Sequence, residues 1–300
     1  MAPVIILLAI VLSAAASGCA EDEPAPSGPF AVATRSLTFV DDSRQTPAFG
    51  EQAELPERTV VTDFWYPAAG DPSAPVTPDA PPAEGRGFPV IVFNHGQQGD
   101  PQQYVLAFEM WARAGYVVAA PRHPLTVTGG PGGHFVDDIE GELGDVPFVI
   151  DRIEDELADL ADVDNLAVAG HSSGAIVAFG VGFNTCCHDD RVDAVLAQGL
   201  LEIPLDGEYS EDLRGTPLII MHGTSDEYPI DQARATFDEA EPPKFFLEIP
   251  GGNHSEDFRV GPRAELSAKA ALAFFDHVLK GRADALEELR ALPGISMEAQ

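Results

Sequence analysis

Short apolar runs alternate with amphipathic segments along most of this chain. Two early segments rich in β-branched and aromatic residues predict an antiparallel pair of strands at 34–40 and 59–66. The later apolar runs predict buried strands at 88–93, 116–120, 166–169, 192–197, 217–221 and 244–249. Helical spacing of apolar residues predicts helices at 103–114, 147–160, 174–183, 230–240 and 265–279. This order predicts one α/β domain with an eight-stranded, mostly parallel sheet and helices on both faces.

Three long segments between these elements lack periodicity. Residues 67–87 are rich in proline and predict a surface loop. Residues 121–144 are irregular and rich in glycine, which is typical of a loop beside a pocket. Residues 198–215 leave room for only a small lid, so we expect an accessible site.

The N-terminal segment differs from the rest of the chain. An apolar run at 4–11 is too short to span a bilayer and ends in small residues, which predicts a signal peptide over 1–18 and an exported protein. The small residues before Cys19 resemble a bacterial lipobox, so we expect lipid attachment at Cys19 and anchoring to a membrane. Without the lipid, the protein would be secreted or periplasmic. We expect an acidic, proline-rich tether at 19–33, the α/β domain at 34–282 and a peripheral tail at 283–300.

The charge of the chain narrows its possible partners. The 300 residues include 17 Lys and Arg against 49 Asp and Glu, which gives a formal net charge of −32. Such a surface repels nucleic acid, so we expect no nucleic-acid partner. The acidic residues are scattered, which favours a role in solubility.

Two adjacent cysteines remain after Cys19. Cys186 and Cys187 close almost no loop, so they are a poor structural staple, although an oxidising compartment would allow a vicinal disulfide. A zinc site would need more ligands than His188 and the two neighbouring aspartates, so we expect no metal.

The sequence Gly-His-Ser-Ser-Gly at 170–174 follows an apolar strand and precedes a run of small residues. A serine on such a strand-to-helix turn projects its hydroxyl outward, and the glycines avoid collisions with the neighbouring strand and helix. The pattern alone is weak, since an ordinary turn can contain it. It makes Ser172 a candidate nucleophile.

The acid and the base that a nucleophilic serine requires are found after later strands. In an open α/β sheet the reacting groups lie at the carboxyl ends of the strands, where Asp226 follows strand 217–221 and His254 follows strand 244–249. A serine needs an imidazole to take its proton, and the imidazole needs a carboxylate to orient it. The order Ser172, Asp226, His254 therefore predicts a catalytic triad, with Glu227 as an alternative acid.

Several segments together resemble the α/β-hydrolase superfamily over about 34–279, within it the group of dienelactone hydrolases, platelet-activating-factor acetylhydrolases and cutinase-like polyester hydrolases. They are Phe-Trp-Tyr-Pro at 64–67, Val-Phe-Asn-His-Gly at 92–96, the motif at 170–174, Gly-Thr-Ser-Asp at 223–226 and Gly-Asn-His at 252–254. The resemblance implies an α/β-hydrolase fold, no cofactor, and an oxyanion hole formed by the backbone N–H groups of Gln97 and Ser173.

The other histidines have weaker cases. His95 and His123 follow strands and are candidates for lining the substrate pocket, and His95 would also hold the oxyanion loop through hydrogen bonds. His171 is expected to pack behind the turn, and His222 to orient its own loop.

These observations lead to a serine hydrolase that cleaves small or polymeric carboxylic esters through an acyl-enzyme. Ester specificity is implied by the resemblance. A peptidase or a thioesterase on the same triad is an alternative within enzymes. A non-catalytic binding protein that kept the fold is an alternative from another class.

Overall fold

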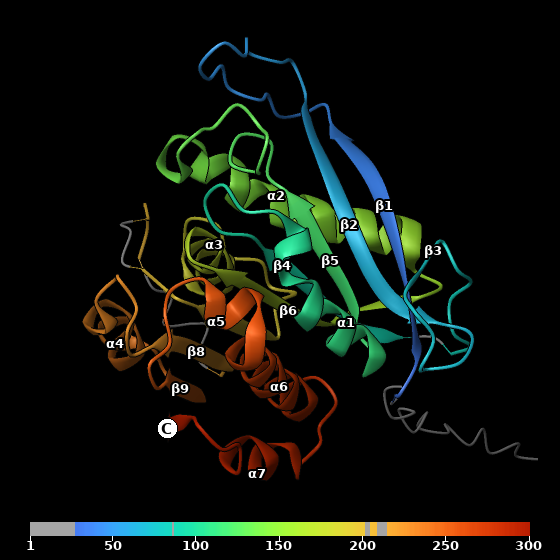
Figure 1. Cartoon of the computed structure of the whole chain (residues 1–300). Helices are drawn as coiled ribbons and strands as arrows, with labels where there is room; N and C mark the ends of the chain where they lie inside the picture. Colours follow the sequence, from blue (N-terminus) through green and yellow to red (C-terminus); the bar gives the residue numbers. More distant parts are fainter. Residues whose placement is uncertain (1–27, 86, 202–204, 209–214) are drawn as a thin grey trace, which may run out of the picture.

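The computed structural model describes residues 28–85, 87–201, 205–208 and 215–300 (Figure 1). Within these residues one sheet runs in the order β10-β9-β8-β7-β6-β4-β5-β2-β1-β3. Its strands are β1 (Ala31–Asp41), β2 (Arg58–Ala68), β3 (Thr77–Pro78), β4 (Phe88–Asn94), β5 (Val117–Arg122), β6 (Ala161–His171), β7 (Ala194–Gln198), β8 (Leu218–Gly223), β9 (Lys244–Ile249) and β10 (Ser296–Ala299). The α/β fold is confirmed, and the sheet includes all eight expected strands with two short ones at its edges.

Helices cover both faces of this sheet. They are η1 (Pro101–Tyr104), α1 (Val105–Arg113), α2 (Phe135–Leu157), α3 (Ser173–Phe183), α4 (Ile230–Glu239), α5 (Glu256–Arg259), α6 (Gly261–Val278) and α7 (Ala285–Arg290). One core joins α2, α3 and α4 to one face, and a second core joins α1, α5, α6 and α7 to the other. The central strands β4 and β7 are buried along their whole length, which explains their uninterrupted apolar sequences.

The middle of the sheet is parallel, antiparallel pairs flank it on both sides, and the short edge strand β3 pairs in parallel with β1. Strands β5, β4, β6, β7, β8 and β9 pair in parallel, so their carboxyl ends meet at one edge. The expected pair of β1 and β2 is confirmed as antiparallel, with Ala31 opposite Ala68, and β2 also runs antiparallel to β5. The candidate site residues Ser172, Asp226 and His254 follow these parallel strands.

Helix α2 is longer than its sequence indicates. Residues 121–144 were expected as a loop, but α2 already begins at Phe135 and includes Pro147. A Cβ at Gly141 would lie 2.8 Å from the Arg58 guanidinium carbon, and one at Gly144 would lie 2.6 Å from Nη1 of Arg44. These glycines therefore leave space for two arginines and do not break the helix.

The C-terminal residues continue the fold. The segment expected as a peripheral tail at 283–300 contains α7 and β10, and β10 pairs with β9 in antiparallel fashion. The expected signal peptide, Cys19 and most of the expected tether at 19–33 lie outside the described residues. Within the part of the chain that the structure describes, no helix combines the length and the apolar composition needed to cross a bilayer.

Candidate active site

Ser172 lies on a sharp turn between β6 and α3. Its backbone has φ 57° and ψ −122°, a conformation that costs free energy for any residue other than glycine. A Cβ at Gly170 would lie 2.0 Å from the carbonyl oxygen of Gly174, and one at Gly174 would lie 2.1 Å from the carbonyl oxygen of Asn94. The two glycines of the motif are therefore required by backbone that passes directly against them.

The structure brings Ser172, His254 and Asp226 together from three strand ends. Nε2 of His254 lies 2.8 Å from Oγ of Ser172, and Nδ1 of His254 lies 2.9 Å from Oδ2 of Asp226. The Asp226 side chain is 1% exposed and the His254 side chain 8% exposed, whereas Ser172 is half-buried. In this geometry the serine hydroxyl donates to the imidazole, and the imidazole donates to the carboxylate.

The loop after β4 packs directly against the serine. A Cβ on Gly96 would lie 3.1 Å from Cβ of Ser172, so the backbone of this loop passes beside the nucleophile candidate. Gln97 is the next residue of the loop, and its side chain donates to the Gly133 carbonyl at 2.5 Å. Ser173 is the first residue of α3, where the positive end of the helix dipole favours negative charge.

His171 joins this loop to the backbone of His254. Nδ1 of His171 lies 2.9 Å from the Tyr104 hydroxyl, which accepts the Gly96 N–H at 3.4 Å. Nε2 of His171 lies 2.6 Å from the carbonyl oxygen of His254. Burial, together with the charges of Arg259 and His254, lowers the pKa of His171 well below its usual range. A neutral ring therefore accepts from Tyr104 and donates to His254, a more specific contact than the packing role expected from sequence.

His95 and His123 do not line a surface that a substrate can reach. They are 1% and 0% exposed, in contrast to their expected place on the pocket wall, because both rings turn beneath the loop into the protein. Nδ1 of His95 lies 2.9 Å from the Gly96 carbonyl oxygen, and its Nε2 accepts the backbone N–H of His123 at 3.2 Å. Burial and the charge of His123 lower the pKa of His95 to about 3, so that ring is neutral. His95 thus holds the loop from within.

Two aromatic residues at the site were not among the expected residues. Tyr104 is described above, and Tyr228 is 40% exposed with its ring centroid 4.6 Å from that of His254. The backbone N–H of Tyr228 donates to Oδ1 of Asp226 at 2.8 Å, which leaves Oδ2 for the histidine. The sequence could have indicated Tyr228 as a site residue, because it lies two positions after Asp226. Glu227 is exposed, and His222 is buried with its Nε2 3.3 Å from the Tyr228 carbonyl oxygen.

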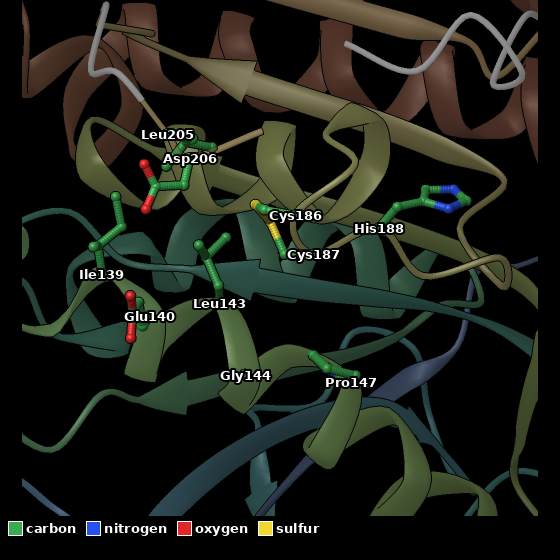
Figure 2. Close-up of a pocket in the computed structure, with 10 residues that line it drawn as sticks. All are labelled: Ile139, Glu140, Leu143, Gly144, Pro147, Cys186, Cys187, His188, Leu205 and Asp206. Atoms are coloured by element: carbon green, nitrogen blue, oxygen red, sulfur yellow. A yellow bond between two sulfur atoms is a disulfide. The ribbon is translucent and has the colours of Figure 1, made fainter. Parts of the chain in front are cut away.

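A cavity of about 580 Å³ lies elsewhere, between α2 and the segment that follows α3 (Figure 2). None of its lining residues belongs to the site around Ser172. They are Ile139, Glu140, Leu143, Gly144, Pro147, Cys186, Cys187, His188, Leu205 and Asp206.

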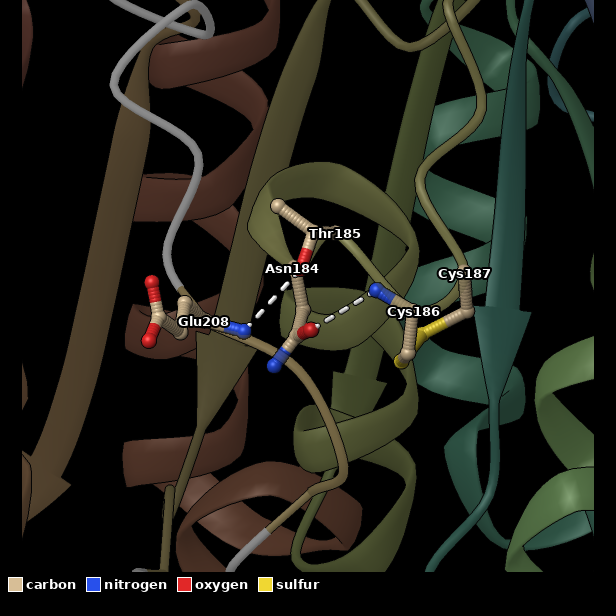
Figure 3. Close-up of a disulfide and its surroundings, with 5 residues drawn as sticks. All are labelled: Asn184, Thr185, Cys186, Cys187 and Glu208. Atoms are coloured by element: carbon tan, nitrogen blue, oxygen red, sulfur yellow. Dashed lines mark hydrogen bonds between the residues drawn. A yellow bond between two sulfur atoms is a disulfide. The ribbon is translucent and has the colours of Figure 1, made fainter.

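Cys186 and Cys187 line this cavity. They are joined in a disulfide (Figure 3). The Cys186 N–H donates to Oδ1 of Asn184 at 2.9 Å, and the Glu208 N–H donates to Oγ1 of Thr185 at 3.0 Å. Across the described ranges, no group of three or more His, Cys, Asp and Glu side chains is arranged to hold a metal ion.

Fold and site together define an α/β hydrolase. The model of the chlorophyllase family matches residues 58–224, which is more than half of the 300 residues, and the chain belongs to this family. Among solved structures, the chain is similar to a ferulic acid esterase from Streptomyces cinnamoneus, with a TM-score of 0.71 and 22% sequence identity. That match covers 91% of this chain and 98% of the other. No curated protein sequence matches the chain.

Replacing Tyr104 with phenylalanine tests the link through His171. The substitution leaves Nδ1 of a buried ring without its donor, which costs about 1–3 kcal/mol of the free energy of unfolding. Urea unfolding followed by circular dichroism measures this loss. Tyr228→Phe is the matched control, because a change to an exposed hydroxyl should alter stability by less than about 0.5 kcal/mol. Equal stability of both variants would show that the Tyr104 hydroxyl does not hold His171.

Proposed function

We propose that this protein is a serine hydrolase that cleaves carboxylic esters through an acyl-enzyme. The observation that carries the proposal is the hydrogen-bonded series Ser172, His254, Asp226 beside the loop that contains Gln97. Membership of the chlorophyllase family supports hydrolysis, and the similar solved structure bears the name of an esterase.

The first half of the reaction forms the acyl-enzyme. Oγ of Ser172 attacks the ester carbonyl carbon while Nε2 of His254 takes the hydroxyl proton. The carbonyl oxygen becomes negatively charged and accepts hydrogen bonds from the backbone N–H groups of Gln97 and Ser173. Asp226 stabilises the imidazolium. When the tetrahedral intermediate collapses, His254 gives its proton to the departing alkoxide, which leaves as an alcohol.

The second half releases the acid. Water gives a proton to His254 and attacks the acyl carbon, and the same two N–H groups hold the oxyanion. The serine oxygen then leaves with the proton from His254. Tyr228 offers an exposed ring face beside His254, where it would contact the substrate.

We also propose a subgroup of the α/β hydrolases for this chain, from the motifs at 64–67, 92–96, 170–174, 223–226 and 252–254. They support kinship with dienelactone hydrolases, platelet-activating-factor acetylhydrolases and cutinase-like polyester hydrolases. Within this proposal the substrate is a small or polymeric ester, and no cofactor takes part.

Ser172→Ala tests the nucleophile. We expect the variant to lose about 10⁴-fold or more in kcat on p-nitrophenyl esters, because the attacking oxygen is absent. Wild-type protein should bind a fluorophosphonate covalently at Ser172, as measured by peptide mass spectrometry. Ser225→Ala, an exposed serine next to Asp226, is the matched control and should retain both activities.

A panel of p-nitrophenyl esters of graded chain length, a thioester and a peptide amide separates the alternatives. Cleavage of the amide with inert esters would identify a peptidase, and preference for the thioester would identify a thioesterase. Folded protein that neither reacts with the fluorophosphonate nor cleaves any of these substrates would support the binding protein.

We also propose export and lipid attachment at Cys19. The apolar run at 4–11 and the small residues before Cys19 support it, as does the disulfide between Cys186 and Cys187, because such bonds persist in oxidising compartments. Mass spectrometry of the mature protein should find an N-terminal Cys19 carrying acyl chains, and Cys19→Ser should abolish membrane association. An unmodified N-terminus at another residue would contradict the proposal.

A further inference from the structure

Beneath the loop with Gln97 lies a group of buried charged side chains that the reaction above does not use. Arg58 is 1% exposed, and His123 and Asp145 are fully buried. Nδ1 of His123 lies 2.9 Å from Oδ2 of Asp145, and its Nε2 lies 3.2 Å from Oδ1 of Asn94. Asn94 is the last residue of β4, directly before the loop.

The orientation of Asn94 determines what His123 must do. Nδ2 of Asn94 donates to the Ala169 carbonyl at 3.1 Å, so Oδ1 is the atom that faces His123. Both ring nitrogens of His123 therefore face oxygen atoms that only accept. A neutral imidazole donates from one nitrogen only, whereas an imidazolium donates from both.

The charges around His123 favour the imidazolium. Burial alone would lower the pKa of His123, but the negative charge of Glu142 and the hydrogen bond to Asp145 raise it above its ordinary value against the opposing charge of Arg58. Burial alone would raise the pKa of Asp145, but hydrogen bonds from His123 and Arg58 lower it to about 2. Both pKa shifts therefore favour the charged forms of His123 and Asp145.

Other groups complete the surroundings of this pair. Arg58 donates to both Asp145 and Asp138, and Arg44 donates to Asp145 at 3.1 Å. Oε1 of Glu142 accepts from Thr126 at 2.6 Å. The His95 ring lies 5.2 Å from that of His123 and is neutral.

Arg122, the last residue of β5, and the following His123 contact the two ends of the loop that contains Gln97. His123 contacts Asn94 through its ring and His95 through its backbone N–H. Its neighbour Arg122 forms an ion pair with Asp100, the residue that caps η1 at the other end of the loop. A change of charge at His123 therefore acts on residues two and three positions before Gln97.

We propose that the His123 imidazolium, held by Asp145, is a positioning residue that fixes the backbone N–H of Gln97 in the oxyanion hole. The link runs through Asn94 and His95. Loss of the proton leaves Nε2 of His123 and Oδ1 of Asn94 as two facing acceptors, and the start of the loop shifts. The catalytic consequence rests on the proposed function, whereas the link between His123 and Gln97 does not.

The direction of the pH dependence follows from the raised pKa of His123. The imidazolium and the stability that it contributes are fully present below the unfolded pKa and are lost as pH rises through the folded pKa. Burial raises the pKa of Glu142 to about 7. Its negative charge therefore forms as pH rises through that range, where it helps His123 to keep its proton. Glu142→Gln removes that charge and should lower the pKa of His123.

Nuclear magnetic resonance of the ¹⁵N-labelled full chain tests the link without a substrate. At pH 7 both ring nitrogens of His123 should be protonated. As pH rises, the ring signals and the backbone amide of Gln97 should change with the same midpoint. Glu142→Gln should lower both midpoints together. Glu140→Gln, an exposed position on the same helix, is the matched control and should leave them unchanged. An unprotonated ring nitrogen at pH 7, or a Gln97 amide that ignores the His123 titration, would overturn the inference.

Ester hydrolysis gives the second readout. The alkaline limb of kcat against pH should move to lower pH in Glu142→Gln by the same amount as the His123 midpoint, with little change in KM. His123→Gln should lower kcat about 10-fold or more at pH 7, because a small misplacement of a catalytic group is costly, and should remove the limb. An unmoved limb in an active Glu142→Gln enzyme would contradict the inference. If the wild type cleaves no ester, the proposed function fails and the resonance experiment still decides the link.

Discussion

The close approach of three backbone segments around Ser172 is the constraint on which the site depends. The carbonyl of Asn94 passes against Gly174, the carbonyl of Gly174 passes against Gly170, and Gly96 packs against Ser172 itself. No side chain fits at these contacts. The turn at Ser172 and the loop with Gln97 therefore pack as one unit, and this close packing holds Ser172 at its positive φ. His254 and Asp226 are then added from separate strands.

Buried polar side chains hold that unit in place, in addition to apolar packing. Tyr104 and His171 connect the loop to the backbone of His254, and His123 connects it to Asp145 on α2. Buried charges are costly unless they are paired and hydrogen-bonded. Arg58 on β2 and Asp145 on α2 meet that requirement through two direct hydrogen bonds. A fully satisfied network of buried hydrogen bonds is rigid and specifies one arrangement of its atoms.

Much of this architecture was predictable from residue patterns, because buried parallel strands are read directly from apolar runs. The positions of Ser172, Asp226 and His254 followed from strand order. The prediction of a helix at 147–160 located only the C-terminal half of α2, because Gly141 and Gly144 indicate a loop, and the space that they leave for Arg58 and Arg44 is visible only in the structure. The sequence also could not predict that His95 and His123 are buried. A residue after a strand can turn toward solvent or toward the core, and only the packing of a distant helix decides which.

We propose that the carboxyl edge of this sheet combines the nucleophile Ser172 with two backbone donors, the N–H groups of Gln97 and Ser173. A crystal structure of the fluorophosphonate-treated protein tests it most directly, since the adduct resembles the tetrahedral intermediate. We expect phosphorus bonded to Oγ of Ser172 and its negatively charged oxygen about 2.7–3.1 Å from the backbone nitrogens of Gln97 and Ser173. An adduct on another residue, or that oxygen turned away from both nitrogens toward solvent, would contradict this proposal.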